Sequence, residues 1–151
     1  MVRPVSDTAT LDEVRTFATQ LSPWAHVATI GADGMPDVAP LHPAWEAGTV
    51  WALIFVNSVK ARNVAVHPEI AMHWQLTEQG DGVELWGTAT VHTDADTKRR
   101  LWDGVFDYNL NDFAPGGPDD SPGAAFLSIV PSRALIVLAY GMKGLRRWRS
   151  D

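Results

Sequence analysis

The stretch GTVWALIFVNSVKARNVAVHPEIAMHW, residues 48–74, decides the fold of this chain. Its first part, 49–56, is a continuous apolar run with the length and composition of a buried strand. A polar Asn-Ser pair then favours the start of a helix, which has to end before Pro68. Residues 69–76 are again apolar and predict a second strand. The stretch therefore predicts a strand, a short helix and a strand, with the helix starting where a buried strand ends.

The start of this helix is a candidate anion site. Asn57 or Ser58 can cap the helix, which leaves free N–H groups and the positive end of the dipole facing outward. A phosphate there would meet Ser58 Oγ and backbone N–H groups, with Lys60 nearby and Arg62 closing from the side. The alternative is that Lys60 and Arg62 are solvated groups on the exposed face of a surface helix.

Short apolar segments separated by turns make up most of the remaining chain. Prolines at 36, 40 and 43 cannot donate to a ladder, so they imply an edge strand, a bulge or a barrel rim. Antiparallel strands this short and numerous usually close into a barrel or sandwich. The predicted strands are 25–31, 36–45, 49–56, 69–76, 83–92, 124–131 and 133–140, and the predicted helices are 8–21, 57–67 and 94–109.

These elements predict one mainly β domain, in which helices are inserted between strands. We expect a single domain over residues 1–151, with an N-terminal helix within 1–22 and a basic C-terminal tail at 141–151. Neither an internal repeat nor a linker interrupts the pattern, so a second domain is not expected.

Composition and charge exclude several classes of protein. The formal net charge of −6 argues against nucleic acid as a general partner, since phosphate backbones need a cationic surface. The absence of Cys excludes disulfides, thiolate catalysis and cysteine zinc sites. No apolar run approaches the roughly 20 residues that cross a membrane, and the start lacks the apolar core of a signal peptide. We therefore expect a cytoplasmic protein without a membrane or nucleic acid partner.

Local motifs identify neither a metal site nor a catalytic residue. HExxH, GxSxG, GxGxxG and the Walker loop are all absent. The five histidines are spread over different predicted elements, so no metal site is predicted. A Ser/His/Asp triad stays open, because its members need not be close in sequence.

Three stretches together resemble the flavin-binding split-barrel superfamily, whose named type is the pyridoxamine 5′-phosphate oxidase fold. They are HVATIGADGMPDVAPL (26–41), the stretch 48–74 and VELWGTATV (83–91). The C-terminal half is similar to the bacterial general-stress branch, and the resemblance covers nearly all of the chain after residue 24. The residues that carry the resemblance to this branch are Lys98, Leu101, Trp102, Phe113, Gly116, Gly117, Asp119 and Asp120, followed by AAFLSIVPSRA.

The resemblance implies a six-stranded antiparallel split β-barrel that works as a homodimer with FMN at the dimer interface. In the family, the residues that match Ser58 and Lys60 bind the phosphate of the flavin, and Arg62 would be a further phosphate-binding residue. The stretch from Asp37 to His42 would pass along the flavin ring, and the second subunit would add an aromatic residue and an Arg. The cofactor-binding residues implied in this way are Asp37, Val38, Ala39, Pro40, Phe55, Val56, Asn57, Ser58, Lys60, Arg62, Trp102, Arg147 and Trp148.

The chain also departs from the family pattern. Pyridoxamine phosphate oxidases bind the substrate phosphate with an RxHxR pattern, whereas the tail here reads GLRRWRS and has no His. Val59 stands where the family has an Arg before the phosphate-binding Lys, and Asp37 aligns near another Arg. These departures argue against oxidation of pyridoxamine phosphate and predict weaker FMN binding.

Several functions fit the resemblance. The first is an FMN-dependent oxidoreductase of unknown substrate. The second keeps the fold but uses a deazaflavin coenzyme, because KARN (60–63) is compatible with both cofactors. The third is a non-catalytic flavin carrier or a stress-linked binding protein. A haem-binding split barrel with His73 as the axial ligand is a more distant alternative.

Overall fold

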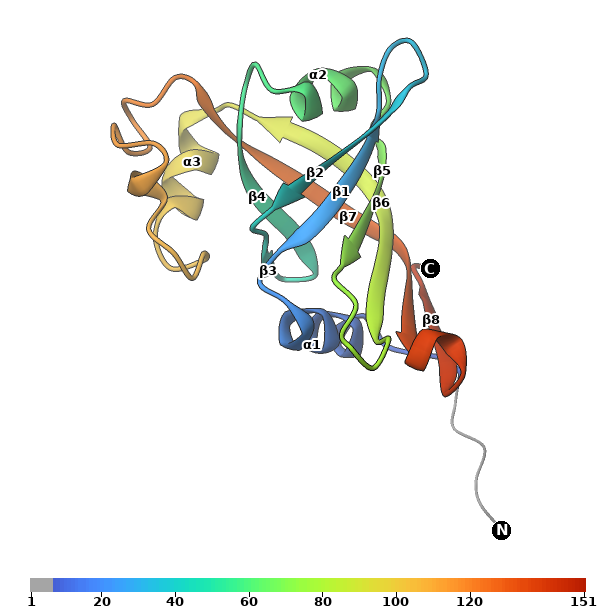
Figure 1. Cartoon of the computed structure of the whole chain (residues 1–151). Coiled ribbons are helices and arrows are strands. Elements are labelled where there is room, and N and C mark those ends of the chain that lie inside the picture. Colours follow the sequence, from blue (N-terminus) through green and yellow to red (C-terminus); the bar gives the residue numbers. More distant parts are fainter. Residues whose placement is uncertain (1–6) are drawn as a thin grey trace.

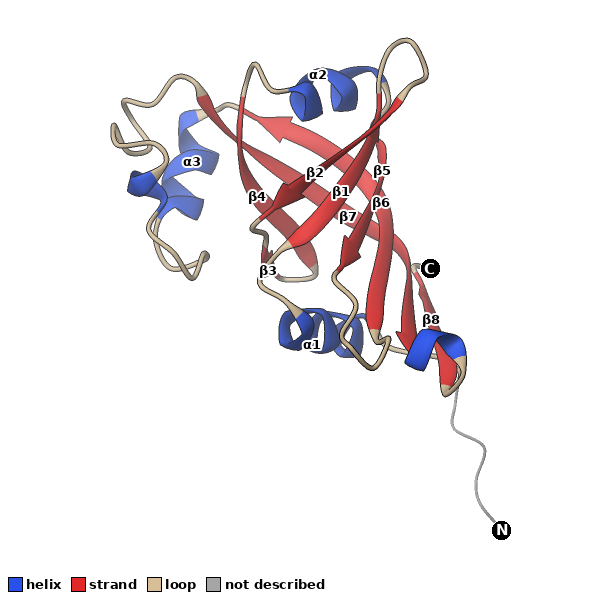
Figure 2. Ribbon diagram, viewed as in Figure 1, coloured by secondary structure: helices blue, strands red, loops and turns tan. Residues whose placement is uncertain are grey.

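An antiparallel sheet of eight strands dominates residues 7–151, the part of the chain that this computed structural model describes (Figures 1 and 2). The strands are β1 (Ala25–Ile30), β2 (Pro36–Leu41), β3 (Ala44–Glu46), β4 (Thr49–Phe55), β5 (Glu69–Trp74), β6 (Gly82–His92), β7 (Ala124–Leu138) and β8 (Gly144–Arg149). The helices are α1 (Leu11–Leu21), α2 (Val59–Val66) and α3 (Ala95–Trp102), and the 3-10 turns are η1 (Leu110–Asp112) and η2 (Ala139–Gly141).

The strand order confirms the predicted mainly β fold. Neighbours in the sheet follow the order β2-β1-β5-β6-β7-β4-β3, and β8 pairs with β7 outside this path. The six strands from β2 to β4 form the barrel that the resemblance implied, and β3 and β8 are additional. The predicted strand 36–45 is wrong as one element, because the chain leaves β2 after Leu41 and enters β3 at Ala44. Association of two copies into a homodimer stays a prediction.

Strand β2 is an edge of the sheet, as its prolines predict. Pro36 and Pro40 lie opposite Ile30 and His26 of β1, and β1 is the only described strand that pairs with β2. On the outer side of an edge strand there is no neighbouring strand to accept a hydrogen bond. A proline, which has no N–H, therefore costs no ladder bond there. The chain then passes through Pro43 into β3, the other edge, so that covalent chain rather than hydrogen bonds joins the two edges.

The core lies inside the curved sheet and is closed at one end by α1 (Figure 1). Burial alternates along β1 and β5, as expected for strands with one face toward a core. Val14 and Ala18 of α1 are fully buried against this core. A second apolar cluster packs α3 and the segment after it against the other face of β4 and β7.

Two predicted strands, 124–131 and 133–140, are wrong as separate elements, because they form the single strand β7. The ladder with β6 continues through a bulge, in which no residue of β6 lies opposite Ser132. A Cβ on Gly87 would lie 2.5 Å from the carbonyl oxygen of Val130, so only glycine fits at this close approach. The bulge therefore replaces the predicted break between strands.

Two further boundaries differ from the prediction. The helix predicted at 94–109 ends at Trp102, because Gly104 has a φ of 87° that a helix cannot continue through. The segment 141–151, predicted as a tail, contains β8, in which Arg147 lies opposite Leu135 of β7. The backbone of Arg147 also bonds to residues 7 and 9, which covers the outer edge of β8.

The β3–β4 turn yields a prediction about stability. Ala47 and Gly48 have φ values of 48° and 82°, the pattern of a two-residue turn with both central residues left-handed. Alanine is strained in this region whereas asparagine tolerates it, so Ala47→Asn should stabilise the fold by about 1 kcal/mol in urea unfolding. Ala32→Asn is the matched control at an exposed turn position with ordinary φ. Equal effects of the two substitutions would contradict the proposed strain.

Candidate functional site

Helix α2 is held in place by a buried side-chain hydrogen bond. Asn63 Nδ2 donates to Thr29 Oγ1 of β1 at 3.0 Å, and the two residues are 8% and 1% exposed. Ala61 and Val64 of the same helix are buried in the core. The bond and the packing fix the direction of α2, and therefore the place of its first turn at the end of β4 (Figure 1).

The first turn of α2 carries positive charge without a compensating acid. Ser58 is the N-cap, and its Oγ accepts a hydrogen bond from the N–H of Ala61 at 3.2 Å. The first turn contains no acidic residue, and Lys60 forms no ion pair with any of residues 7–151. The helix dipole and the ammonium therefore add at one place, which favours a bound anion.

Lys60 faces a cavity of about 240 Å³ at the junction of β2, β4, α2 and the segment after α3. The cavity lies where the chain leaves β2 and where β4 ends. None of the Asp and Glu residues within 7–151 lines it. Its lining includes Pro40, Phe55, Ser58 and Lys60 among the predicted cofactor residues, together with His42, Tyr108 and Phe113.

An aromatic wall forms one side of this cavity. The ring of His42 stacks on Tyr108 with centroids 4.2 Å apart, and Tyr108 meets Phe113 edge-on at 5.6 Å. The hydroxyl of Tyr108 donates to the carbonyl oxygen of His42 at 3.4 Å. His42 Nε2 lies 2.9 Å from Asp107 Oδ1, an ion pair when the imidazole is protonated, although the approach is too far off the ring N–H direction for a hydrogen bond.

Sequence reasoning placed His42 at the end of the stretch along the flavin ring, but it did not assign Asp107 or Tyr108 to the site. Tyr108 and His42 are separated by 66 positions, and no local motif links the two segments. The predicted helix at 94–109 also placed Asp107 and Tyr108 on a helix, whereas they lie in irregular chain beyond Trp102. Only the tertiary structure brings these segments together.

Several predicted cofactor residues lie beside the cavity without lining it. The guanidinium of Arg62 donates to the carbonyl oxygen of Asn57 at 2.9 Å, so it folds back over the start of the helix. Val56 lines a different groove, between α2 and β6. Asp37, Val38 and Ala39 lie further back along β2, and Val38 lines a shallow hollow on the outer face of the sheet.

The predicted residues from the C-terminal half lie apart from the cavity within one chain. Trp102 is 8% exposed, and its Nε1 donates to Asn111 Oδ1 at 2.5 Å inside the second apolar cluster. Arg147 and Trp148 lie on β8, at the opposite end of the sheet from α2, where they line a separate cavity of about 140 Å³ (Figure 1). Their assignment to the cofactor of a second subunit stays a prediction.

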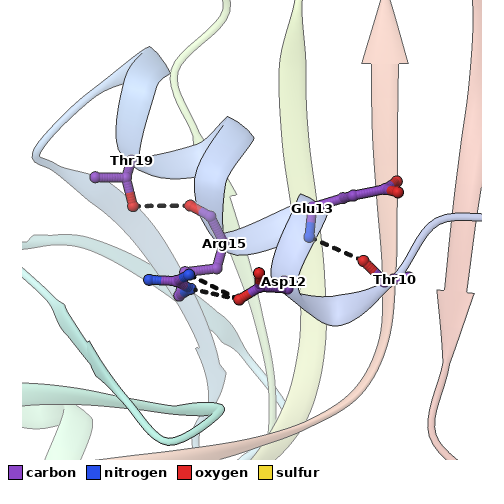
Figure 3. Close-up of polar contacts among 5 residues, drawn as sticks. All are labelled: Thr10, Asp12, Glu13, Arg15 and Thr19. Carbon is purple, nitrogen blue, oxygen red and sulfur yellow. Dashed lines mark hydrogen bonds and ion pairs between the residues drawn. The ribbon is translucent and has the colours of Figure 1, made fainter.

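A neighbouring cavity of about 230 Å³ lies between α1 and the segment 43–45. Arg15 lines it, but Asp12 holds its guanidinium at 2.7 Å on the surface of α1 (Figure 3). Asp107 also lines this cavity and does not line the one beside Lys60. A carboxylate together with a paired arginine makes this cavity a poor phosphate site.

Residues 7–151 contain neither a cluster of metal-binding side chains nor a membrane-spanning helix. No group of three or more His, Asp or Glu side chains in this range is placed to hold a metal ion. None of its helices has both the length and the apolar character needed to span a membrane. His73 lies opposite His26 on neighbouring strands and lines the hollow on the outer face of the sheet.

A family model described as pyridoxamine 5′-phosphate oxidase matches residues 10–137. The chain belongs to the pyridoxamine 5′-phosphate oxidase family. The match ends within β7, so β8 with Arg147 and Trp148 lies beyond the part that the family model covers. No protein of curated function matched the chain.

Solved structures with the same fold include relatives of different functional descriptions. A Clostridium acetobutylicum protein related to general stress protein 26 of Bacillus subtilis superposes with a TM-score of 0.75 at 19% identity, over 93% of this chain and 94% of that one. A pyridoxamine 5′-phosphate oxidase-related FMN-binding protein from Nostoc punctiforme gives 0.66 at 14% identity, over 93% and 94%. An F420 reductase gives 0.56 at 22% identity, over 76% and 90%. At such low sequence identities, the likeness shows that this chain shares their fold and shows nothing about its function.

The buried contact of α2 yields a testable prediction. Asn63→Ala should lower the free energy of unfolding by about 1–3 kcal/mol, because it leaves the buried Thr29 hydroxyl without its donor. Thr29→Val should cost a similar amount on its own. Chemical unfolding of the single and double variants should show coupling, with the double variant less destabilised than the sum. Additive effects would contradict a direct contact between the two side chains.

A second prediction concerns Tyr108. Burial, followed by the charge of Asp107, raises the pKa of Tyr108 to about 12. Because the unfolded phenol ionises near 10, folding stability should fall as the pH rises from about 10 to about 12. Absorbance titration of phenolate should show a step near 12 that Tyr108→Phe removes. A Tyr108→Phe protein with the same titration and the same alkaline loss of stability would contradict the assignment.

Proposed function

We propose that this chain binds FMN with its phosphate at the first turn of α2, and that it acts as a flavin-dependent oxidoreductase in a homodimer. The observation that carries the proposal is Lys60, an ammonium without an acidic partner among residues 7–151, beside the helix turn capped by Ser58. It lines a cavity without carboxylates, where a phosphate meets only favourable charge.

The remaining lining of the cavity suits an aromatic cofactor. Phe55, Tyr108 and Phe113 present apolar ring surface, and β4 adds Leu53 and Ile54. When it is bound, a flavin supplies the hydride and electron chemistry at its ring system, and the protein supplies binding and orientation. In this proposal, Lys60 and the helix turn bind the phosphate, while the aromatic side chains exclude water from the ring.

A second copy of the chain would complete the site in this proposal. Phe55 is 49% exposed and Val38 is 66% exposed, so part of the cavity mouth and the nearby outer face of β2 are left uncovered by one chain. Arg147 and Trp148 of a second copy are the residues proposed to approach the cofactor. Trp102 is left out of this role, because it is buried and its N–H is satisfied within its own chain.

Two sequence features of this chain argue against pyridoxamine phosphate as the substrate. Val59 supplies no charge where pyridoxamine phosphate oxidases carry an Arg, and GLRRWRS lacks their His. Oxidation of pyridoxamine phosphate is therefore not proposed. The substrate is another molecule that accepts or donates electrons at a flavin.

Two alternatives share the same cavity. A deazaflavin coenzyme is supported by the F420 reductase among the similar structures, and its phosphate would take the same place beside Lys60. A non-catalytic flavin carrier is the other alternative. Reduction of bound FMN by NADH or NADPH, followed by reoxidation by an added acceptor, would separate an oxidoreductase from a carrier.

The proposal predicts that Lys60→Ala weakens FMN binding by roughly 10- to 100-fold, since a hydrogen bond to a charged group is worth about 1.5–3 kcal/mol. Quenching of flavin fluorescence during titration measures the affinity. Lys143→Ala is the matched control, because Lys143 is exposed and lies outside the cavity. If the Lys60 variant and the control bind FMN with the same affinity, the phosphate does not bind beside Lys60. Tighter binding of a deazaflavin than of FMN would favour that alternative.

A further inference from the structure

The His42–Asp107 pair is oriented across the wall of the proposed flavin cavity. His42 lines this cavity, whereas Asp107 lines the neighbouring cavity between α1 and the segment 43–45. Nε2 and Oδ1 are 2.9 Å apart, so the two side chains form an ion pair when the imidazole is protonated. The imidazole of the pair therefore faces the flavin cavity, and the carboxylate faces the neighbouring cavity.

The position of the imidazole is fixed from several sides. Its ring stacks on Tyr108 at 4.2 Å, and Trp24 approaches it edge-on at 6.1 Å. The side chain of His42 is 28% exposed, whereas that of Asp107 is 74% exposed. The ring thus stands as a fixed part of the wall, while the carboxylate stays in contact with water.

We propose that His42 is the cationic group by which this cavity binds reduced flavin more tightly than oxidised flavin, with Asp107 as its positioning residue. This inference rests on the proposed function. The oxidised flavin ring is neutral, whereas the reduced ring readily gives up the proton at N1 and becomes an anion. A cation in the wall of a cavity without carboxylates favours the anion, and charge near a flavin ring is a known means of tuning its electronics.

Lys60 does not produce the same discrimination. In the proposed function it binds the phosphate, which carries the same charge in both redox forms, and therefore strengthens the binding of both. His42 comes from the end of β2, a different element, and is the second basic side chain that lines the cavity. The two groups consequently have separable roles: Lys60 sets the affinity, and His42 sets the ratio of the two affinities.

The test measures that ratio. Dissociation constants for oxidised FMN and for FMN reduced under anaerobic conditions are determined for the wild-type protein, His42→Gln, Asp107→Asn and a control, His67→Gln. His67 is exposed at the far end of α2 and lines none of the cavities described above. A midpoint potential of bound FMN reports the same quantity, since a tenfold change in the ratio corresponds to about 30 mV for two electrons.

We expect the wild type to bind reduced FMN more tightly than oxidised FMN. His42→Gln should lower this preference about tenfold. Asp107→Asn should lower it by a smaller factor, because the imidazole stays but loses its neighbouring carboxylate. His67→Gln should leave the preference unchanged. Since Asp107 is largely exposed, its variant keeps the inference testable even if the His42 variant folds poorly.

Other outcomes would overturn the inference. If FMN binds and the preference is the same in His42→Gln as in the control, the imidazole does not act on the redox state. If both affinities fall by the same factor, His42 is only a packing residue of the wall. A wild-type protein that binds neither form of FMN would contradict the proposed function, and this inference would fail with it. In the first two results the wild-type protein still binds FMN, so failure of this inference is distinguishable from failure of the proposed function.

Discussion

One buried hydrogen bond, from Asn63 Nδ2 to Thr29 Oγ1, ties α2 to β1, and the candidate site depends on it. The helix has only eight residues, too few to be stable without tertiary contacts. Its position is therefore set by this bond and by its own two apolar residues in the core, Ala61 and Val64. Because the bond holds the direction of the helix, the turn capped by Ser58 and the ammonium of Lys60 stay at the end of β4, beside the cavity.

The cavity arises from the way the barrel closes. The edge strands β2 and β3 are joined by chain and not by a ladder, so the wall of the barrel is incomplete where β2 ends. The segment after α3 covers this place with Tyr108 and Phe113, and Asp107 meets His42 there. An anionic, aromatic ligand would thus find positive charge from Lys60 at the start of α2 and ring surface from the segment after α3.

The sequence predicted the parts of this arrangement that depend on neighbouring residues. The end of a buried strand, a serine cap and a lysine within one helical turn are local, so Ser58 and Lys60 could be assigned before the fold was known. The prolines of β2 predicted an edge for the same reason. The His42–Asp107 pair could not be found in this way. It depends on α3 ending at Trp102, whereas Val105 and Phe106 continue an apolar pattern that resembles a longer helix and instead pack in the second cluster.

The central claim is that the first turn of α2 recognises the phosphate of a flavin. The most direct test compares the affinities of the wild-type protein for FMN and for riboflavin, which share the ring system and differ by the phosphate. Fluorescence titration of the two ligands under the same conditions should show FMN binding at least about tenfold more tightly, the value of a charged hydrogen bond. Equal affinities for FMN and riboflavin would contradict the account.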